Sequence, residues 1–274
     1  MVVAVVGLGL IGGSILRGLA ASGLTDRLLG FDTSVPAVDH FRELGLDAYG
    51  ASELSRAEQA DLWVVATPPR TLASVLDEVA ALRQSDSVVT DVASIKGSFR
   101  DSAAPIGSHF VGGHPIAGKS ASHHSLADPD LFVDAPWALC DDFEPSREVR
   151  HRVETMVYAL DAQPIWMSSE EHDRHLGLLS HLPHILAAVL LHQSLGLSHV
   201  GLGGGSWRDL TRVGGNYAEL WAQILPQNRE HVRAHLAALK AKIEDVDALL
   251  AAGSDEELEA FLTEADRIRR GGEA

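Results

Sequence analysis

The chain has 274 residues, of which 46% are hydrophobic and 22% charged, a composition typical of a globular protein with room for one large or two modest domains. Acidic side chains number 38 against 22 basic ones, and the net charge of −16 argues against nucleic acid or an anionic membrane surface as a partner. A single cysteine, Cys140, excludes an internal disulfide framework and favours a reducing, cytoplasmic location.

The first part of the chain, residues 1–167, alternates short apolar runs with amphipathic stretches. The apolar runs predict strands at 2–6, 28–31, 62–66, 87–90, 137–140 and 163–167. Helical periodicity predicts helices at 11–21, 35–44, 72–82 and 145–160. The segment 110–136 is rich in Gly, His, Ser and Asp and is predicted to be a loop. Strands separated by helices of this length predict right-handed βαβ units and a parallel sheet.

The second part, residues 168–274, is predicted to be helical throughout, with helices at 168–195, 217–225, 228–250 and 258–270. Capping boxes precede the first and last of these, Ser168 with Glu171 and Ser254 with Glu257. The longest apolar run, 185–191, is far shorter than the roughly 20 residues that a spanning helix needs, so no membrane span is predicted. The predicted fold class is therefore α/β: a doubly wound, Rossmann-type dinucleotide-binding domain at 1–167, followed by an all-helical domain at 168–274.

A glycine loop follows the first predicted strand and opens the first helix. It reads Gly7-Leu8-Gly9-Leu10-Ile11-Gly12, the GxGxxG spacing. Gly7 permits the tight turn, Gly9 lets the backbone approach a pyrophosphate, and Gly12 permits close helix–strand packing. The helix N-terminus, at Leu10 and Ile11, offers free N–H groups to the phosphates. A glycine-rich turn without a ligand is the alternative.

Two further features belong to the predicted dinucleotide site. Asp32 ends the second strand, 20 residues past Gly12, and is predicted to accept hydrogen bonds from the adenosine ribose. Its charge repels a 2′-phosphate, which favours NAD over NADP. Thr67 and Pro68 follow a buried strand, at the edge where ligands sit in parallel sheets, although they are equally compatible with a plain turn.

His114 is the candidate for acid–base chemistry. Gly112, Gly113 and Pro115 fix the backbone around it, and a histidine near neutral pKa suits general-base work on an alcohol during hydride transfer. The alternative is a turn histidine without a role. Ser94 can orient a catalytic group and Lys96 can serve a carboxylate, but taken alone the segment is better explained as a helix start with Ser94 as its N-cap.

Histidines and arginines mark the helical part. His172, His175, His181 and His184 lack an HExxH pattern, a cysteine partner and a carboxylate set at ligand spacing, so no metal is predicted. His172 and His175 are interpreted as polar surface residues, whereas Pro183 interrupts the helix and suggests a shaped site wall. Arg208 and Arg212, on a glycine loop with Asp209, are candidates to bind a carboxylate, with helix capping and an Arg–Asp pair as the alternative.

The motifs together resemble one family. The segments GLGLIGGS, VVATPP, TDVASIKG, GGHPIAG, EHDRHLGLLSHLPH and GGGSWRDLTR stand in the order and spacing of the prephenate/arogenate dehydrogenase family, and the likeness extends to about residue 250. The resemblance implies oxidative decarboxylation of prephenate by NAD to 4-hydroxyphenylpyruvate, CO2 and NADH on the route to tyrosine. Arogenate dehydrogenase, which gives tyrosine directly, is the alternative within the family.

The resemblance also implies roles for individual residues. His114 matches the catalytic histidine, and Ser94 matches the serine that orients it and the substrate hydroxyl. Arg212 matches the arginine that holds the ring carboxylate, with Asp209 as its support. His184 matches a histidine near the substrate side chain, and His181 lines the same wall.

The sequence departs from the family pattern just after GGHPIAG. A small and then an acidic residue are common there, whereas this chain has Lys119 and Ser120. A cation at 119 would welcome a substrate carboxylate and oppose the ammonium of arogenate, which predicts a preference for prephenate.

The apolar helices of the second part, and the resemblance, predict a homodimer formed through that part. Two other classes of protein remain open. One is another NAD-dependent dehydrogenase, such as a β-hydroxyacid dehydrogenase, in which a lysine of the helical domain acts as the catalytic group. The other is a non-catalytic NAD-sensing protein.

Overall fold

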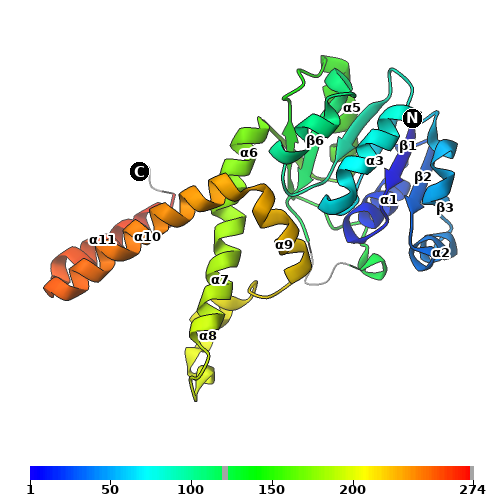
Figure 1. Ribbon diagram of the computed structural model, residues 1–274. Coiled ribbons are helices and arrows are strands. Elements are labelled where there is room, and N and C mark those ends of the chain that lie inside the picture. The colour runs from blue at the N-terminus through cyan, green and yellow to red at the C-terminus, as the bar shows by residue number, and fades with distance from the viewer. Residues whose placement is uncertain (119–122, 272–274) are drawn as a thin grey trace.

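The computed structural model describes residues 1–118 and 123–271 and consists of a sheet part and a helical part (Figure 1). The sheet has the strand order β3-β2-β1-β4-β5-β6-β7-β8. Its strands are β1 (Val2–Val6), β2 (Arg27–Asp32), β3 (Ala48–Gly50), β4 (Leu62–Val65), β5 (Val88–Asp91), β6 (Phe110–Pro115), β7 (Pro136–Cys140) and β8 (Gln163–Met167). All neighbouring strands are parallel except β6 and β7, which are antiparallel. The predicted doubly wound α/β sheet is confirmed.

The core lies on both faces of this sheet. Residues of β1 alternate between the two faces: Val3 and Val5 belong to one apolar cluster, and Ala4 and Val6 to the other. The first cluster is covered by α1 (Leu10–Ser22), α2 (Val35–Glu43) and α5 (Arg147–Ala159). The second is covered by η1 (Ala51–Ala57), α3 (Pro69–Leu82) and α4 (Arg100–Ala103). Both faces of the sheet are thus shielded from solvent, which explains why the central strands are continuously apolar in sequence.

The prediction of a loop throughout 110–136 is wrong at its start, where β6 forms. Gly112 and Gly113 have little preference for strands, yet both lie in the ladder opposite Cys140 and Leu139 of β7. A Cβ atom at Gly113 would lie 2.4 Å from the backbone oxygen of Asp91. Gly113 is therefore required by the close approach of β5, a tertiary constraint that local propensity does not carry.

The helical part begins with one long helix. It comprises α6 (Ser169–Leu176), a π-helical turn η5 (Gly177–His181) and α7 (Leu182–Gln193). The Ser168 side chain accepts a hydrogen bond from the backbone N–H of Glu171 at 3.1 Å, which confirms the predicted N-cap. Pro183 does not interrupt the helix as predicted, because it lies in the first turn of α7, directly after the wider turn. That turn accommodates the proline ring and its missing N–H.

By length and composition, the helix from Ser169 to Gln193 is long and apolar enough to cross a membrane. The prediction from the longest apolar run did not anticipate this. However, its side chains His172, Asp173, His181 and His184 are buried within the folded chain. Only 28% of the most apolar 18-residue window of this helix is buried.

The remaining helices are α8 (Gly204–Thr211), α9 (Ala218–Gln227), α10 (Arg229–Ala252) and α11 (Asp255–Arg269). The sequence predicted a glycine loop where α8 forms. Ser254 stands at the N-cap of α11, but its side chain makes no capping hydrogen bond, so the second predicted capping box is not formed. Figure 1 shows α9 returning toward the sheet part, whereas α10 and α11 extend away from it as an arm.

Candidate active site

A cluster of polar side chains, half-buried at His114 and buried elsewhere, lies where β6 meets the helical part. His114 comes from β6, His172 and Asp173 from α6, and His181 from the π-turn. His172 is 0% exposed and His181 is 1% exposed. The interpretation of His172 as a surface residue is therefore wrong: the first turns of α6 pack against the sheet part and bury it.

Three of these side chains form a continuous chain of contacts. His114 Nδ1 lies 2.9 Å from His172 Nε2, and His172 Nδ1 lies 2.8 Å from Asp173 Oδ1. The Asp173 carboxylate also accepts hydrogen bonds from the backbone N–H groups of Lys96 at 2.9 Å and Gly97 at 2.8 Å. The loop after β5 thus fixes the Asp173 end of this series of contacts, and β6 carries the His114 end.

The electrostatics of the cluster favour a neutral His114 and a neutral His181 together with an ionised Asp173. Burial lowers the pKa of His114 well below its ordinary value, and the charges of His172, Lys96 and His181 lower it further. Burial lowers the pKa of His181 to about 4. For Asp173, burial favours a higher pKa, but hydrogen bonds from His172 and from the backbone of Gly97 and Lys96 outweigh it, and the pKa falls.

A second wall of the cluster comes from α7, α9 and the start of α10. The ring of Trp221 stacks on His184 with centroids 3.9 Å apart and an angle of 19° between the planes. The Asn228 amide nitrogen donates to the backbone carbonyl of Asp173 at 2.7 Å and lies 3.0 Å from His181 Nδ1. Asn228 therefore joins the two helical segments that carry the histidines.

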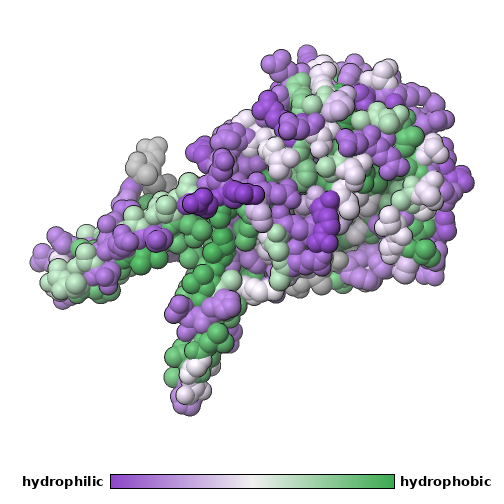
Figure 2. Space-filling view, in the orientation of Figure 1, coloured by the Kyte–Doolittle hydropathy of each residue, from purple (hydrophilic) through white to green (hydrophobic). Residues whose placement is uncertain are grey.

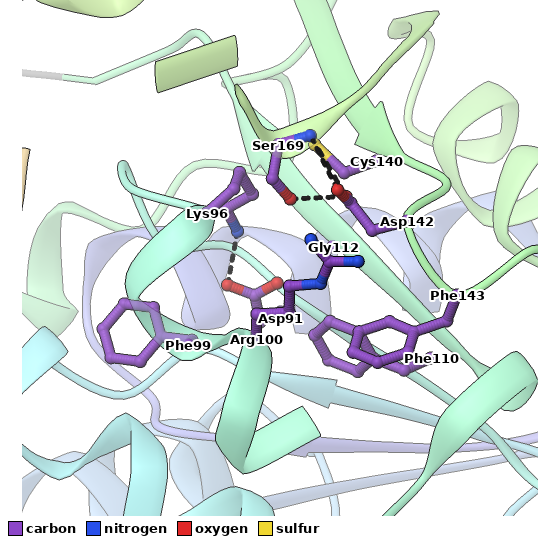
Figure 3. Close-up of a pocket in the computed structure, with 10 residues that line it drawn as sticks. All are labelled: Asp91, Lys96, Phe99, Arg100, Phe110, Gly112, Cys140, Asp142, Phe143 and Ser169. Carbon is purple, nitrogen blue, oxygen red and sulfur yellow. Dashed lines mark hydrogen bonds and ion pairs between the residues drawn. The ribbon is translucent and has the colours of Figure 1, made fainter. Parts of the chain in front are cut away.

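A buried ion pair fixes the backbone beside His114 (Figure 3). Lys96 Nζ lies 2.5 Å from Asp91 Oδ2 and donates to the backbone carbonyl of Gly113 at 2.6 Å. The other Asp91 oxygen accepts from the Gly113 N–H at 3.1 Å. Both charged side chains are only 2% exposed. The carboxylate that Lys96 serves is thus Asp91, and the pair clamps the residue directly before His114.

The glycine loop forms a cradle at the carboxyl edge of the sheet. Gly7 has φ +98°, and a Cβ there would lie 2.6 Å from the Ala66 carbonyl oxygen. A Cβ at Gly12 would lie 1.8 Å from the Gly7 oxygen, whereas one at Gly9 would meet nothing within 4 Å. Gly7 and Gly12 are therefore required by packing, and Gly9 faces open space at the N-cap of α1.

Asp32 and Thr67 border this cradle. Asp32 accepts hydrogen bonds from the backbone N–H groups of Leu8 at 2.6 Å and Ser34 at 2.7 Å, which orient its carboxylate at the end of β2. The Thr67 hydroxyl, after β4, is shielded from solvent and has no hydrogen-bond partner among the described residues. Pro68 is the exposed N-cap of α3. A buried hydroxyl without a protein partner is unusual and can be satisfied by water or by a bound ligand.

Comparison with known proteins decides the family. The nucleotide-binding domain of prephenate dehydrogenase matches residues 15–164, and the dimerization domain of prephenate dehydrogenase matches residues 168–264. The chain belongs to the prephenate dehydrogenase family. The predicted family and fold class are confirmed, and with them the assignment to the NAD-dependent oxidoreductases.

Individual relatives agree with this assignment. The prephenate dehydrogenase of Bacillus subtilis (strain 168) is 30% identical over 82% of this chain and 64% of its own length. The prephenate dehydrogenase of Lactococcus lactis is 28% identical over 97% of this chain and 76% of its own length. The chain thus spans about two thirds to three quarters of these relatives.

Solved structures extend the likeness to the whole fold. The structure of A. aeolicus prephenate dehydrogenase in complex with hydroxyphenyl propionate and NAD+ has a TM-score of 0.91, at 26% identity, and the match covers 99% of this chain and 98% of that one. Synechocystis arogenate dehydrogenase has a TM-score of 0.88 at 26% identity, with 99% of both chains covered. Family members named for either substrate therefore share this architecture.

Other residues that the prephenate dehydrogenase motifs singled out are not joined to the histidine cluster. Ser94 is half-buried in the loop after β5, and the described residues show no hydrogen bond between it and His114. Arg208, Asp209 and Arg212 are exposed on α8 and at its end. Their side chains make no ion pair within the described ranges, so the suggested Arg–Asp pair is not formed. Lys119 and Ser120 lie outside the described residues.

Sequence reasoning missed the buried partners of His114, namely His172 and Asp173, and the clamp formed by Asp91. The signal for the first two was an acid next to a histidine at a helix start, but this pattern is also common on exposed first turns, where acids favour the helix dipole. Only the packing of α6 on the sheet part distinguishes the two cases.

Proposed function

We propose that this chain catalyses the NAD-dependent oxidative decarboxylation of prephenate to 4-hydroxyphenylpyruvate. The observation that carries the proposal is His114, whose pKa is held well below its ordinary value by burial, so that it is an unprotonated base at neutral pH. It lies near the carboxyl end of β6, on the same edge of the sheet as the glycine loop. Oxidation of an alcohol by hydride transfer needs a base at that edge.

The cradle fits NAD. Gly9 leaves open space where a pyrophosphate would approach, and the backbone N–H groups of Leu10 and Ile11 begin α1 beside it. The Asp32 carboxylate is suited to the adenosine ribose and repels a 2′-phosphate, and the Thr67 hydroxyl is available to hydrogen-bond the cofactor together with the turn at Pro68. When bound, NAD+ supplies the hydride acceptor.

The protein's own residues then transfer a proton and bind the carboxylates of the substrate. His114 accepts the proton of the ring hydroxyl as hydride leaves the same carbon. Loss of the ring carboxylate as CO2 makes the ring aromatic, and the protonated His114 can return its proton to the phenolate oxygen. Ser94 is proposed to orient this exchange. Arg212 is proposed to hold the ring carboxylate, and Arg208 and Asp209 are proposed to bind the substrate from the same segment.

The wall formed by His181 and His184 is proposed to face the substrate side chain. Burial lowers the pKa of both histidines, so they act there as neutral hydrogen-bonding groups. Lys119 is proposed to favour prephenate over arogenate, because a cation attracts the extra carboxylate and repels an ammonium group.

We also propose a division into domains at 1–167 and 168–274, and a cytoplasmic homodimer formed through the second domain. Figure 2 shows apolar surface along α7 and along the arm of α10 and α11. Exposed apolar side chains on these helices include Val189, Ile243, Leu250, Leu262 and Ile268. Such faces are covered in stable proteins, and the matching family model is that of a dimerization domain.

The proposal is tested by NADH formation with prephenate and with arogenate, each offered with NAD and with NADP. We expect turnover with prephenate and NAD, and His114→Asn should abolish turnover while NAD binding survives. Turnover of arogenate alone would overturn the proposed role of Lys119. No NADH formation with either substrate, despite NAD binding, would favour another dehydrogenase or an NAD sensor.

A further inference from the structure

We infer that His172 and Asp173 are positioning residues that set the tautomer of His114 and share the positive charge it gains during the reaction. The inference rests on the proposed function for its catalytic consequence, but the tautomer itself does not. His172 is fully buried and touches His114 on one side and Asp173 on the other. No part of the base's proposed chemistry requires this second histidine, so its place needs an explanation.

The hydrogen bonds determine where each proton lies. Asp173 is ionised and can only accept, so His172 Nδ1 carries a proton and donates it to Oδ1 at 2.8 Å. A neutral His172 then has a lone pair on Nε2. The neighbouring atom at 2.9 Å, His114 Nδ1, must therefore be the protonated nitrogen of a neutral His114. Its Nε2 is left with the lone pair that a general base needs.

The hydrogen bonds to Asp173 favour its ionised form. The Asp173 carboxylate accepts from two backbone N–H groups, those of Lys96 and Gly97, in addition to His172. It cannot turn away from His172 without leaving these two backbone donors unpaired, which is unfavourable. The loop after β5 thus fixes the acceptor that fixes the tautomer.

The contacts from His114 through His172 to Asp173 also let the positive charge move away from His114. When His114 Nε2 takes the substrate proton, the ring becomes a cation whose Nδ1 proton points at the lone pair of His172. Movement of that proton to His172 Nε2 leaves His114 neutral and forms an imidazolium ion beside the Asp173 carboxylate. The reverse movement restores the original state when His114 Nε2 gives its proton to the phenolate, so no proton is gained or lost.

This arrangement compensates for the surroundings of His114. Lys96 lies on one side, and the other histidine packed nearby is His181, which also lowers the pKa of His114 if it is charged. Among these groups, the Asp173 carboxylate, linked to His114 through His172, is the negative charge that lets the half-buried base accept a proton. Asp91 is already paired with Lys96.

Asp173→Asn is the sharpest test because the new side chain has the same shape. Oδ1 accepts from both His172 Nδ1 and the Lys96 N–H, and Oδ2 accepts from the Gly97 N–H. When the Asn oxygen stays on the Gly97 N–H, its NH2 group takes the Oδ1 position, faces His172 Nδ1 and leaves the Lys96 N–H without its acceptor. His172 then carries its proton on Nε2 and donates to His114 Nδ1, which moves the His114 proton to Nε2, the wrong nitrogen for a base. A comparable reversal in a serine-protease triad lowers kcat about 10,000-fold.

The tautomer is read by ¹⁵N NMR of the imidazole nitrogens in the full-length protein, with His114→Gln used to assign the His114 signals. We expect a protonated Nδ1 and an unprotonated Nε2 in the wild type, and the reverse in Asp173→Asn. This measurement needs no substrate. A wild-type His114 with its proton on Nε2 would overturn the inference whatever the enzyme turns over.

The catalytic consequence is read from prephenate turnover as a function of pH. We expect Asp173→Asn to lower kcat at least 100-fold with little change in KM. His172→Leu should behave similarly, whereas His172→Gln, which keeps an acceptor for His114, should recover part of the loss. His175→Gln on the same helix is the matched control, since His175 makes no hydrogen bond among the described residues, and its kcat should stay near that of the wild type.

The outcomes separate the two proposals. If the tautomer is as stated but the wild type turns over no prephenate, the proposed function fails and the tautomer assignment stands. If the tautomer reverses in Asp173→Asn while kcat and its pH profile are unchanged, the catalytic role of the pair is refuted. If His172→Gln is no better than His172→Leu although both melt at the wild-type temperature, the pair acts only by packing.

Discussion

Removing Lys96 should expose how much the clamp beside His114 contributes to stability. In Lys96→Met the apolar stem remains, but the Asp91 carboxylate loses its ion pair inside a site where both side chains are 2% exposed. Removing one partner of a buried pair typically costs about 3–5 kcal/mol, because the other charge stays buried. Asp91 keeps two backbone donors, Ala93 at 2.9 Å and Gly113 at 3.1 Å. We therefore expect a loss near the lower limit, about 3 kcal/mol.

Such a loss is measurable by urea unfolding followed through tryptophan fluorescence, because Trp63 and Trp137 are fully buried in the sheet part. It corresponds to a fall in Tm of about 6 °C or more, at about 2–4 °C per kcal/mol for domains of this size. The matched control is Lys242→Met. Its ion pair with Asp245 has a similar length, 3.0 Å, but the side chains are 70% and 59% exposed. A pair so exposed is worth about 0–1 kcal/mol.

The reasoning is refuted if Lys96→Met is no more destabilising than Lys242→Met. A double-mutant cycle sharpens the test, since Asp91→Asn removes the charge that Lys96→Met strands. The double variant should therefore lose less stability than the sum of the two single variants. Additive losses would mean that the two side chains do not interact as the geometry indicates.

Two further results are expected. Gly9→Ala should melt at the wild-type temperature yet bind NAD at least about tenfold more weakly. Gly12→Ala should lose stability as well, because its Cβ would overlap the Gly7 oxygen. Unchanged NAD affinity in Gly9→Ala would contradict the proposed cradle. The free energy of unfolding should also fall in acid. The pKa values of His114 and His181 are lowered on folding, so the unfolded chain binds more protons as the pH falls. Urea unfolding should therefore show a loss of stability that begins near pH 6.5 and continues toward about pH 4, the pKa of His181. A flat profile across that range would show that these histidines are not neutral in the folded protein.

The sequence by itself determined the features that depend on near neighbours along the chain. The first strand, the GxGxxG turn, the first helix and Asp32 lie within one βαβ unit, and their roles follow from backbone geometry: Gly7 does adopt a positive φ, and Asp32 does end β2. The same holds for the N-cap at Ser168, where a hydroxyl satisfies an N–H three residues away. Local rules suffice because every partner is local.

The tertiary structure decided the rest. Gly112 and Gly113 form a strand because they pair with Cys140 and Leu139 of β7, and position 113 needs glycine because the Asp91 backbone oxygen occupies the space that a side chain would fill. His172 is buried because β6 and the loop after β5 cover the first turns of α6, and the helix continues from the π-turn that holds His181 through Pro183 to His184. Burial and hydrogen bonding to distant backbone are properties of pairs of surfaces. For this reason the sequence could point to His114 as the base, while the residues that set its protonation emerged only in the folded chain.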